Sequence, residues 1–229
     1  MSALQYESEL EGEEFGGGPN GHGLPRVAVS PGTLQRVGPA AARAALSAGS
    51  SGLAAAELEG EYEFEFEGEQ AAGEALLSPV RRVYADAMME HFGHVAAQAE
   101  SEAEAEAFIA ALVPLAARLL PRVAPTIMRA APGLIRGVAG ITRTLRRNPQ
   151  TRPLVRALPT IVRRTVADLG RQSSRGRPAT VEGAVRTLAR QTSGVLSQPH
   201  RCQAALRRSA AADHRFHRVA RAQPRRVAI

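Results

Sequence analysis

Two pairs of histidines have the residue type and spacing closest to those of a metal site. His91 and His94 lie three residues apart, as do His214 and His217 near the end of the chain. Residues with this spacing share one face of a helix, so each pair can converge on an ion, and both pairs together would supply four ligands. The HExxH spacing of zinc proteases is absent, and no Cys or carboxylate at a matching spacing completes either pair. We therefore expect no stoichiometric zinc and no cofactor, and treat His91 and His94 as weak metal candidates.

No other pattern of catalytic residues is present. The sequence has no GxSxG, Walker loop, GxGxxG or Cys-His combination. Ser209 lies near Asp213 and His214 along the chain, but closeness in sequence does not make a catalytic triad. Cys202, the single cysteine, cannot form a disulfide within the chain and is expected to be a small buried residue. The sequence leaves an enzyme open, with a metal-dependent enzyme at His91 and His94 as one alternative, and favours a protein without catalytic activity.

The charged residues are divided unevenly along the chain. All 29 basic residues are Arg, and the net charge is +7. Residues 1–110 carry 19 acidic residues and 5 Arg, whereas residues 111–229 carry 24 Arg and 3 acidic residues. Such a division indicates an acidic arm and a basic body that needs acidic partners. The exclusive use of Arg fits either a GC-rich genome or selection for the bidentate guanidinium group.

Six arginines form a stripe along a predicted amphipathic helical stretch between residues 118 and 147. At about 100° per residue they fall within an arc of about 60°. This Arg stripe consists of Arg118, Arg122, Arg129, Arg136, Arg143 and Arg147. Large apolar residues such as Leu134 occupy another side of the helix, and prolines, including Pro125 and Pro132, fall beside the arginines. Because proline disrupts helix hydrogen bonds, we expect short helices that begin with proline or one curved helix.

A second pattern lies in the acidic arm. Residues 57–67 alternate Glu with Gly or a large apolar residue, which is the period of a strand with one carboxylate face and one apolar face. The candidate interaction residues are Glu61, Tyr62, Glu63, Phe64, Glu65, Phe66 and Glu67. The rest of residues 1–77 has few large apolar side chains, so burial there cannot offset the entropy of ordering. We expect a largely disordered arm, with a strand near 58–66 and at most a short helix over 39–46.

Helix signals follow the arm and predict a mostly α protein. Ser78-Pro79 begins a helix that runs to about residue 99, and Ser101 with Glu104 is a capping-box start for a helix to about residue 120. Further helices are predicted over 153–169, over 180–197 and from residue 199 onwards. The expected fold is an irregular bundle or stack of amphipathic helices punctuated by proline.

The predicted regions are a low-complexity acidic arm (1–77), an Arg-rich helical domain (78–212) and a basic C-terminal tail (213–229). The segment 122–129 recurs as 156–163, which indicates either a duplication or similar use of helices. The acidic N-terminal residues lack the apolar core of a signal peptide, and the longest apolar run, 107–117, is about half the length that spans a bilayer. We expect a protein that is cytoplasmic on synthesis, with non-classical export left open.

Several segments resemble a family of uncharacterised bacterial proteins with acidic E-[FYL]-E and EGE arms and an Arg/Pro-rich helical C-terminal region. The matching segments are Glu102–Pro125, Thr144–Thr165, Gly176–Thr180, Arg186–Thr192 and Cys202–Ser209. The chain departs from the family's pattern in its arm, which is short and interrupted by residues 14–56. The resemblance implies an association with bacterial surface or injection-type systems, and it supplies no activity and no catalytic residue.

The favoured function is that of a non-enzymatic interaction or structural protein. In this hypothesis the acidic, aromatic-dotted arm and the Arg-striped body associate within one chain or between chains. The alternative is a membrane-surface or membrane-active protein, such as a secreted effector, that uses the amphipathic stretch 118–147 on anionic lipid. Nonspecific nucleic-acid binding is less favoured, because residues 111–229 hold one aromatic residue, Phe216, and offer no platform for base stacking.

Overall fold

The structure, a computed structural model of the 229-residue chain, describes residues 29–51, 79–121, 124–177 and 180–222. In these ranges all regular secondary structure is helical, which confirms the predicted mostly α fold. The elements are α1 (Pro31–Ser50), α3 (Pro79–Gln98), α4 (Glu102–Ala110), α5 (Leu112–Arg118), α6 (Ala124–Arg146), the 3-10 helix η2 (Arg152–Ala157), α7 (Leu158–Ser174), α8 (Val181–Leu196) and α9 (Pro199–Ala222). The predicted strand near 58–66 lies outside the described residues. None of the described helices is both long and apolar enough to cross a membrane.

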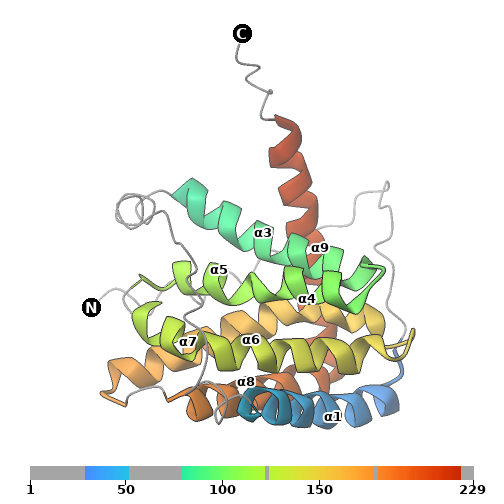
Figure 1. Ribbon diagram of the computed structural model, residues 1–229. Coiled ribbons are helices and arrows are strands. Elements are labelled where there is room, and N and C mark those ends of the chain that lie inside the picture. Colours follow the sequence, from blue (N-terminus) through green and yellow to red (C-terminus); the bar gives the residue numbers. More distant parts are fainter. Residues whose placement is uncertain (1–28, 52–78, 122–123, 178–179, 223–229) are drawn as a thin grey trace.

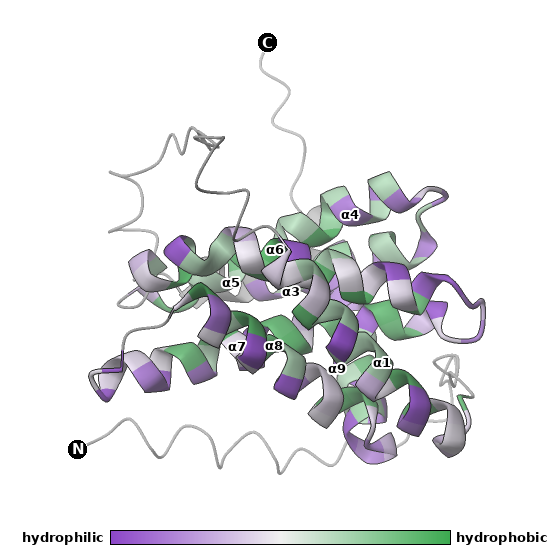
Figure 2. Cartoon of the chain, turned by 60° about the horizontal axis from the view of Figure 1, so that its bottom comes forward, coloured by the Kyte–Doolittle hydropathy of each residue, from purple (hydrophilic) through white to green (hydrophobic). Residues whose placement is uncertain are grey.

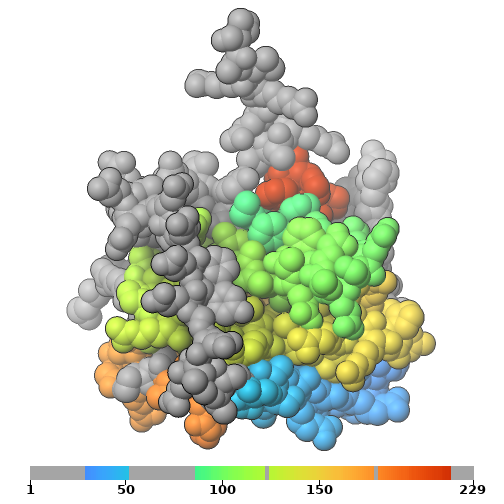
Figure 3. Space-filling view, in the orientation of Figure 1, coloured from blue at the N-terminus to red at the C-terminus, as the bar shows by residue number. Residues whose placement is uncertain are grey.

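The helices are arranged in layers around α6. Figure 1 shows α1 and α8 below α6, α4 and α5 above it, and α3 higher still. α6 contacts α1, α8, α4 and α5, so it lies at the centre of the body. α1 forms the lower edge of the body in the space-filling view of Figure 3. α9 packs against α3 and η2, and its C-terminal end projects beyond the other helices (Figure 1).

The predicted apolar side of α6 is the centre of the core. Ile127, Leu134, Val138, Ile141 and Leu145 are each at most 1% exposed. Figure 2 shows that the helices carry hydrophobic and hydrophilic residues in alternation rather than in separate blocks. The stretch forms one 23-residue helix, with one proline in its first turn and a second, exposed proline inside it. Water can reach the carbonyl groups that this exposed proline leaves without an intrahelical donor.

The prediction that residues 1–77 lack stable structure is wrong over Pro31–Ser50, which form the 20-residue helix α1. The helix begins with Ser30, whose Oγ accepts a hydrogen bond from Thr33 N at 3.2 Å, followed by proline. Its buried face consists of Leu34, Gly38, Ala41, Ala45 and Gly49. The argument from missing large side chains failed because small residues bury area through close approach of backbones.

Glycines of α6 make that close approach to α1 possible. A Cβ added at Gly140 would lie 2.7 Å from Ala44 O and 2.8 Å from Ala48 Cβ. A Cβ added at Gly49 would lie 2.6 Å from Val185 Cγ1 on α8. The packing of α1 against α6 and α8 therefore depends on the absence of side chains at these positions.

The capping signals at Ser101 are confirmed, although the predicted long helix is interrupted. Ser101 Oγ accepts a hydrogen bond from Glu104 N at 3.0 Å, and the Glu104 carboxylate accepts one from the N–H of Glu100 at 3.1 Å rather than from that of Ser101. The helix ends at Ala110, and the separate helix α5 begins at Leu112.

Two arginines satisfy the C-terminal carbonyl groups of α3. Arg146 donates to Ala96 O at 2.6 Å and to Ala99 O at 2.7 Å. Arg152 donates to Ala97 O at 2.9 Å and also to Ala99 O. Burial and the neighbouring Arg152 lower the pKa of Arg146 from its ordinary value. Both cations also oppose the negative end of the helix dipole, so they fix the end of α3 against the body.

The predicted boundary between the helical domain and a tail at residue 213 is wrong. α9 continues without a break to Ala222, and Asp213 and Phe216 contact α3 through His91. The composition of this stretch, rich in Arg and His, led to the prediction of a tail. Its contacts with α3 make it part of the body.

We predict that Gly140→Ala lowers the free energy of unfolding by about 1–3 kcal/mol, because the new methyl group displaces the backbone of α1. The measurement is urea unfolding followed by circular dichroism. The matched control is Gly32→Ala, whose Cβ would meet nothing within 4 Å. It should leave stability unchanged or raise it by about 0.5 kcal/mol. Equal effects of the two substitutions would show that α1 does not pack on α6 in this way.

Candidate functional site

The polar face of α3 meets α7 and α9 at one buried position. Arg163 of α7 donates from NH1 to Asp86 Oδ1 and from NH2 to Glu90 Oε1, the latter at 2.6 Å. The side chains of Arg163 and Glu90 are 14% and 0% exposed. Arg208 of α9 adds a weaker contact to Asp86 at 3.4 Å. These groups, hereafter the Arg163 network, tie three helices together by charge.

Burial leaves Glu90 unusually easy to protonate. Desolvation raises the pKa of its carboxyl to about 7, against the lowering effect of Arg163. Glu90 Oε2 and Ser209 Oγ of α9 are both buried, and neither makes a hydrogen bond of good geometry to a described residue. Ser209 is nevertheless close enough that a hydrogen bond from its hydroxyl is among the factors that lower the pKa of Glu90.

Next along α3, the two histidine pairs seen in the sequence meet around one carboxylate. His91 Nδ1 lies 3.0 Å from Asp213 Oδ1, and His217 Nε2 lies 3.6 Å from the same oxygen. His94 Nδ1 lies 3.8 Å from Asp213 Oδ2. We name these four side chains the His–Asp cluster. His214, the fourth histidine of the two pairs, is exposed.

Aromatic and backbone packing hold the His–Asp cluster in place. The ring of Phe216 stacks on that of His91, with centroids 4.3 Å apart and planes inclined by 13°. Gly93, between the two α3 histidines, leaves room for Pro159, since an added Cβ would lie 2.8 Å from Pro159 Cγ. Burial lowers the pKa of His94, with Asp213 opposing the shift and Arg156 adding to it. The neutral imidazole is therefore favoured at this position.

The cluster brings the imidazole nitrogens of three histidines next to one carboxylate. Among the described residues, His91, Asp213 and His217 could hold a metal ion, because one ligand atom from each lies within 4.8 Å of the others. The sequence showed both histidine pairs, and Asp213 lies four residues before His217 on one helix face. Its contact with His91 could not be read from the sequence, because it joins two helices whose contacting residues are 122 positions apart.

The Arg stripe is not one continuous surface. Arg118 lies on α5, Arg129, Arg136 and Arg143 on α6, Arg147 just after α6, and Arg122 outside the described residues. Arg129 is exposed and Arg136 half-buried. Arg143 Nε donates to Glu106 Oε1 of α4 at 2.5 Å. The arm candidates, Glu61 to Glu67, also lie outside the described residues.

Sequence reasoning missed the arginines that face inwards. Arg146, Arg152 and Arg163 belong to the same compositional run as the exposed arginines, so composition could not separate them. Asp86 and Glu90, four residues apart on one helix face, were the available signal for a buried cationic partner. Cys202 is buried as expected, and burial raises the pKa of its thiol to about 11.

The chain matches no protein-family model, no curated protein and no solved structure. The resemblance to the bacterial family with acidic arms therefore stays a prediction, and function has to be argued from the geometry.

Breaking the Arg163 network should be costly. We predict that Arg163→Met lowers the free energy of unfolding at pH 8 by about 3 kcal/mol, because the carboxylates of Asp86 and Glu90 lose their buried partner. Arg164→Met removes the same charge from an exposed neighbour and should change stability by less than about 0.5 kcal/mol. Chemical denaturation of both variants measures the two losses of unfolding free energy. If Arg163→Met loses as little as Arg164→Met, the network contributes little to stability.

Glu90 should also make stability depend on pH. The folded chain retains a proton that an unfolded chain releases between the ordinary pKa of 4.5 and about 7. The contribution of Glu90 to stability therefore falls as pH rises through this window, by about 3 kcal/mol in total. His94, with its lowered pKa, acts in the opposite direction below its ordinary value of 6.5.

The comparison of wild type with Glu90→Gln isolates the effect of Glu90, since His94 is common to both. Relative to wild type, the variant should become more stable as pH rises from 5 to 8. Unfolding curves at several pH values measure the difference, and a constant difference across this range would contradict the buried protonated carboxyl.

Proposed function

We propose that the chain is a non-enzymatic binding protein whose arginine-rich helical body associates with an acidic segment, first of all its own residues 57–69. The observation that carries this proposal is the imbalance of charge on the described surface. Sixteen arginines are exposed there, against four exposed acidic residues. The four are Glu100, Glu102, Glu104 and Glu182. A surface of this kind attracts an acidic partner and repels a second copy of itself.

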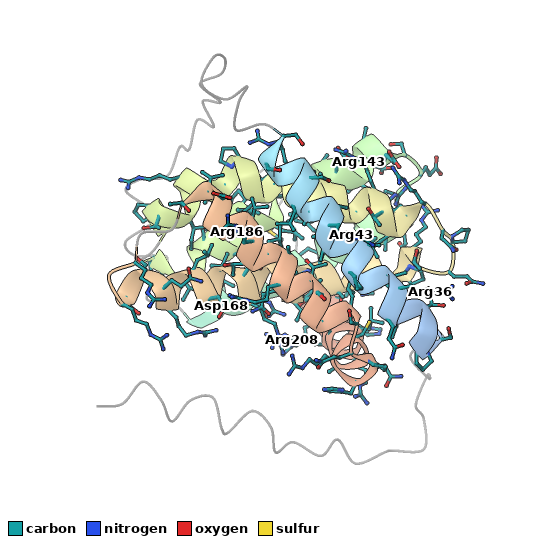
Figure 4. All side chains as sticks on the ribbon, turned by 90° about the horizontal axis from the view of Figure 1, so that it is seen from below. Arg36, Arg43, Arg143, Asp168, Arg186 and Arg208 are labelled. Carbon is teal, nitrogen blue, oxygen red and sulfur yellow. The ribbon has the colours of Figure 1, made fainter. Side chains whose placement is uncertain are left out.

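Ion pairs within the body neutralise a small part of this surface. Arg186 pairs with Glu182, and Arg171 with Asp168. Figure 4 shows Arg36 and Arg43 along α1, with Arg186 on the neighbouring helix. Exposed pairs contribute under about 1 kcal/mol each, so an acidic segment would have to engage several arginines together.

The segment 57–69 is suited to this surface by its charge and its attachment. It holds seven Glu, together with Tyr62, Phe64 and Phe66. It lies in the connection between α1 and α3, both of which belong to the body. A segment tethered at both ends meets the surface at a high effective concentration, so weak pairs can act together.

One end of the body combines the charge and the apolar area that such a segment needs. The C-terminal end of α1 packs there on α6 and α8, since Gly49 closely approaches Val185 and Gly133 O. A hollow at this end is lined by Leu46, Ser50, Glu182, Val185 and Arg186.

The lining of this hollow includes one arginine, Arg186, and one exposed apolar side chain, Leu46. Leu46 and Met128, at 38% and 40% exposure, are the large apolar side chains that the described residues leave exposed. Arg129 follows Met128 on α6 and lies one turn before Gly133, the α6 residue that Gly49 approaches. The connection to residues 57–69 leaves α1 at this end, so the segment needs little chain to reach it.

Neutralising the segment should free the arginine surface. In the full-length chain with Glu61→Gln, Glu63→Gln and Glu65→Gln, a separate labelled peptide with the sequence of residues 57–69 should bind about tenfold more tightly than to wild type, because the tethered segment competes less. Fluorescence anisotropy at low salt measures this binding. Salt near 1 M, where the screening length is about 3 Å, should abolish it.

The matched control is Glu100→Gln, Glu102→Gln and Glu104→Gln, which changes the net charge equally at the start of α4 and keeps a capping side chain at 104. It should bind the peptide as weakly as wild type does. Adding Arg129→Gln and Arg186→Gln to the arm variant should remove peptide binding, whereas Arg164→Gln and Arg175→Gln should not. Binding of anionic vesicles or duplex DNA without any binding of the peptide would replace this proposal with the lipid or nucleic-acid alternative.

A further inference from the structure

The His–Asp cluster has the spacing of a metal site. The shortest distances from Asp213 Oδ1 are 3.0 Å to His91 Nδ1 and 3.6 Å to His217 Nε2. Ligand atoms placed about 2.1 Å from a tetrahedral metal ion lie about 3.4 Å from one another, so both distances suit a shared ion. The three ligand atoms lie within 4.8 Å of one another, and a rotation of the half-exposed ring of His217 would close the remaining gap.

His94 adds a third imidazole, which has an unsatisfied nitrogen. Its Nδ1 lies 3.8 Å from Asp213 Oδ2, and its Nε2 is buried and makes no hydrogen bond to a described residue. Of the three imidazole rings around Asp213, His91 alone is within hydrogen-bond distance of the carboxylate. The buried Nε2 of His94 is the polar atom that hydrogen bonding among the described residues leaves unexplained.

We propose that His91, Asp213 and His217, with His94 beside them, bind a divalent transition-metal ion of the zinc class between α3 and α9. Imidazole nitrogens select such ions over magnesium and calcium, which prefer sets of oxygen ligands. The proposal replaces the sequence-based expectation of no zinc, because the fold brings Asp213 to the histidines as the carboxylate that each pair lacked. It is independent of the association proposed between the arginine surface and the arm.

The residues around the cluster hold its ligands in place and limit its affinity for a metal ion. Phe216 stacks on His91, and the Arg163 network one turn earlier holds α3 in its orientation. Nearby cations, Arg156 among them, oppose a second positive charge, so binding should be weaker than in a closed site with several thiolates. An ion here would connect α9 to α3 at the point where α9 leaves the body, and would hold the two helices together (Figure 1).

The test uses the full-length chain freed of metal with a chelator. Titration with Zn²⁺ followed by calorimetry should give one equivalent bound with a dissociation constant below about 10 µM. The midpoint of thermal unfolding should rise with the concentration of free Zn²⁺. Co²⁺ should give visible absorption bands of a site with nitrogen and oxygen ligands, and this readout on the wild type does not depend on any variant.

Three variants assign the ligands, with circular dichroism as the check on folding. His217→Ala and Asp213→Asn should each weaken Zn²⁺ binding by at least about tenfold. His200→Ala removes an exposed histidine from the first turn of the same helix and should leave binding unchanged. Absence of saturable one-to-one binding by wild type below 100 µM Zn²⁺, or undiminished binding by the folded His217→Ala and Asp213→Asn variants, would overturn the proposal.

Discussion

The guanidinium groups of Arg146, Arg152 and Arg163 fix α3, and the upper half of the molecule depends on its position. Of the large apolar side chains of α3 whose burial is described, Met89 is fully buried, while Met88 and Phe92 are partly buried against the core. Arg146 and Arg152 bind its last carbonyl groups, while Arg163 binds two carboxylates on its side. These charged hydrogen bonds are strong because they are partly removed from water, and each would be costly to break singly. The attachment of α3 also fixes the orientation of its histidines, His91 and His94.

Periodicity predicted those parts of the fold in which large apolar residues repeat. The face of α6 that includes Leu134 and Ile141 could be read directly from the sequence, as could the helix starts at Pro79 and Ser101. α1 could not be predicted in this way, because its buried face is made of Gly and Ala. The area that it buries depends on how closely two backbones approach, and this distance is a property of the pair of helices rather than of either sequence. For the same reason both histidine pairs could be found, but not the contact of Asp213 with the histidines of α3.

Arginine has two physical roles in this protein. Where the guanidinium group is buried it satisfies carbonyl or carboxylate oxygens, as Arg152 and Arg163 do. Where it is exposed, as for Arg43 and Arg129, it produces a positive surface whose charge the body's own acidic residues do not balance. The two groups alternate along one compositional run, so the charge of residues 111–229 overstates the charge available to a partner. A partner meets the exposed group alone, and the geometry of α1, α6 and α8 decides where that group is densest.

The order of α1 and its partners along the chain has a consequence for synthesis. A 20-residue helix with little large apolar surface is marginal in water by itself. Its docking partners, from Gly133 on α6 to Val185 on α8, emerge from the ribosome some 80 to 135 residues later. Docking of α1 is therefore a late step that closes a long loop of chain, and the acidic segment is enclosed within that loop. A truncation that removes residues 1–77 as a dispensable arm would also remove α1. The α6 surface around Gly133, Gly137 and Gly140, which α1 covers, would then be exposed to water.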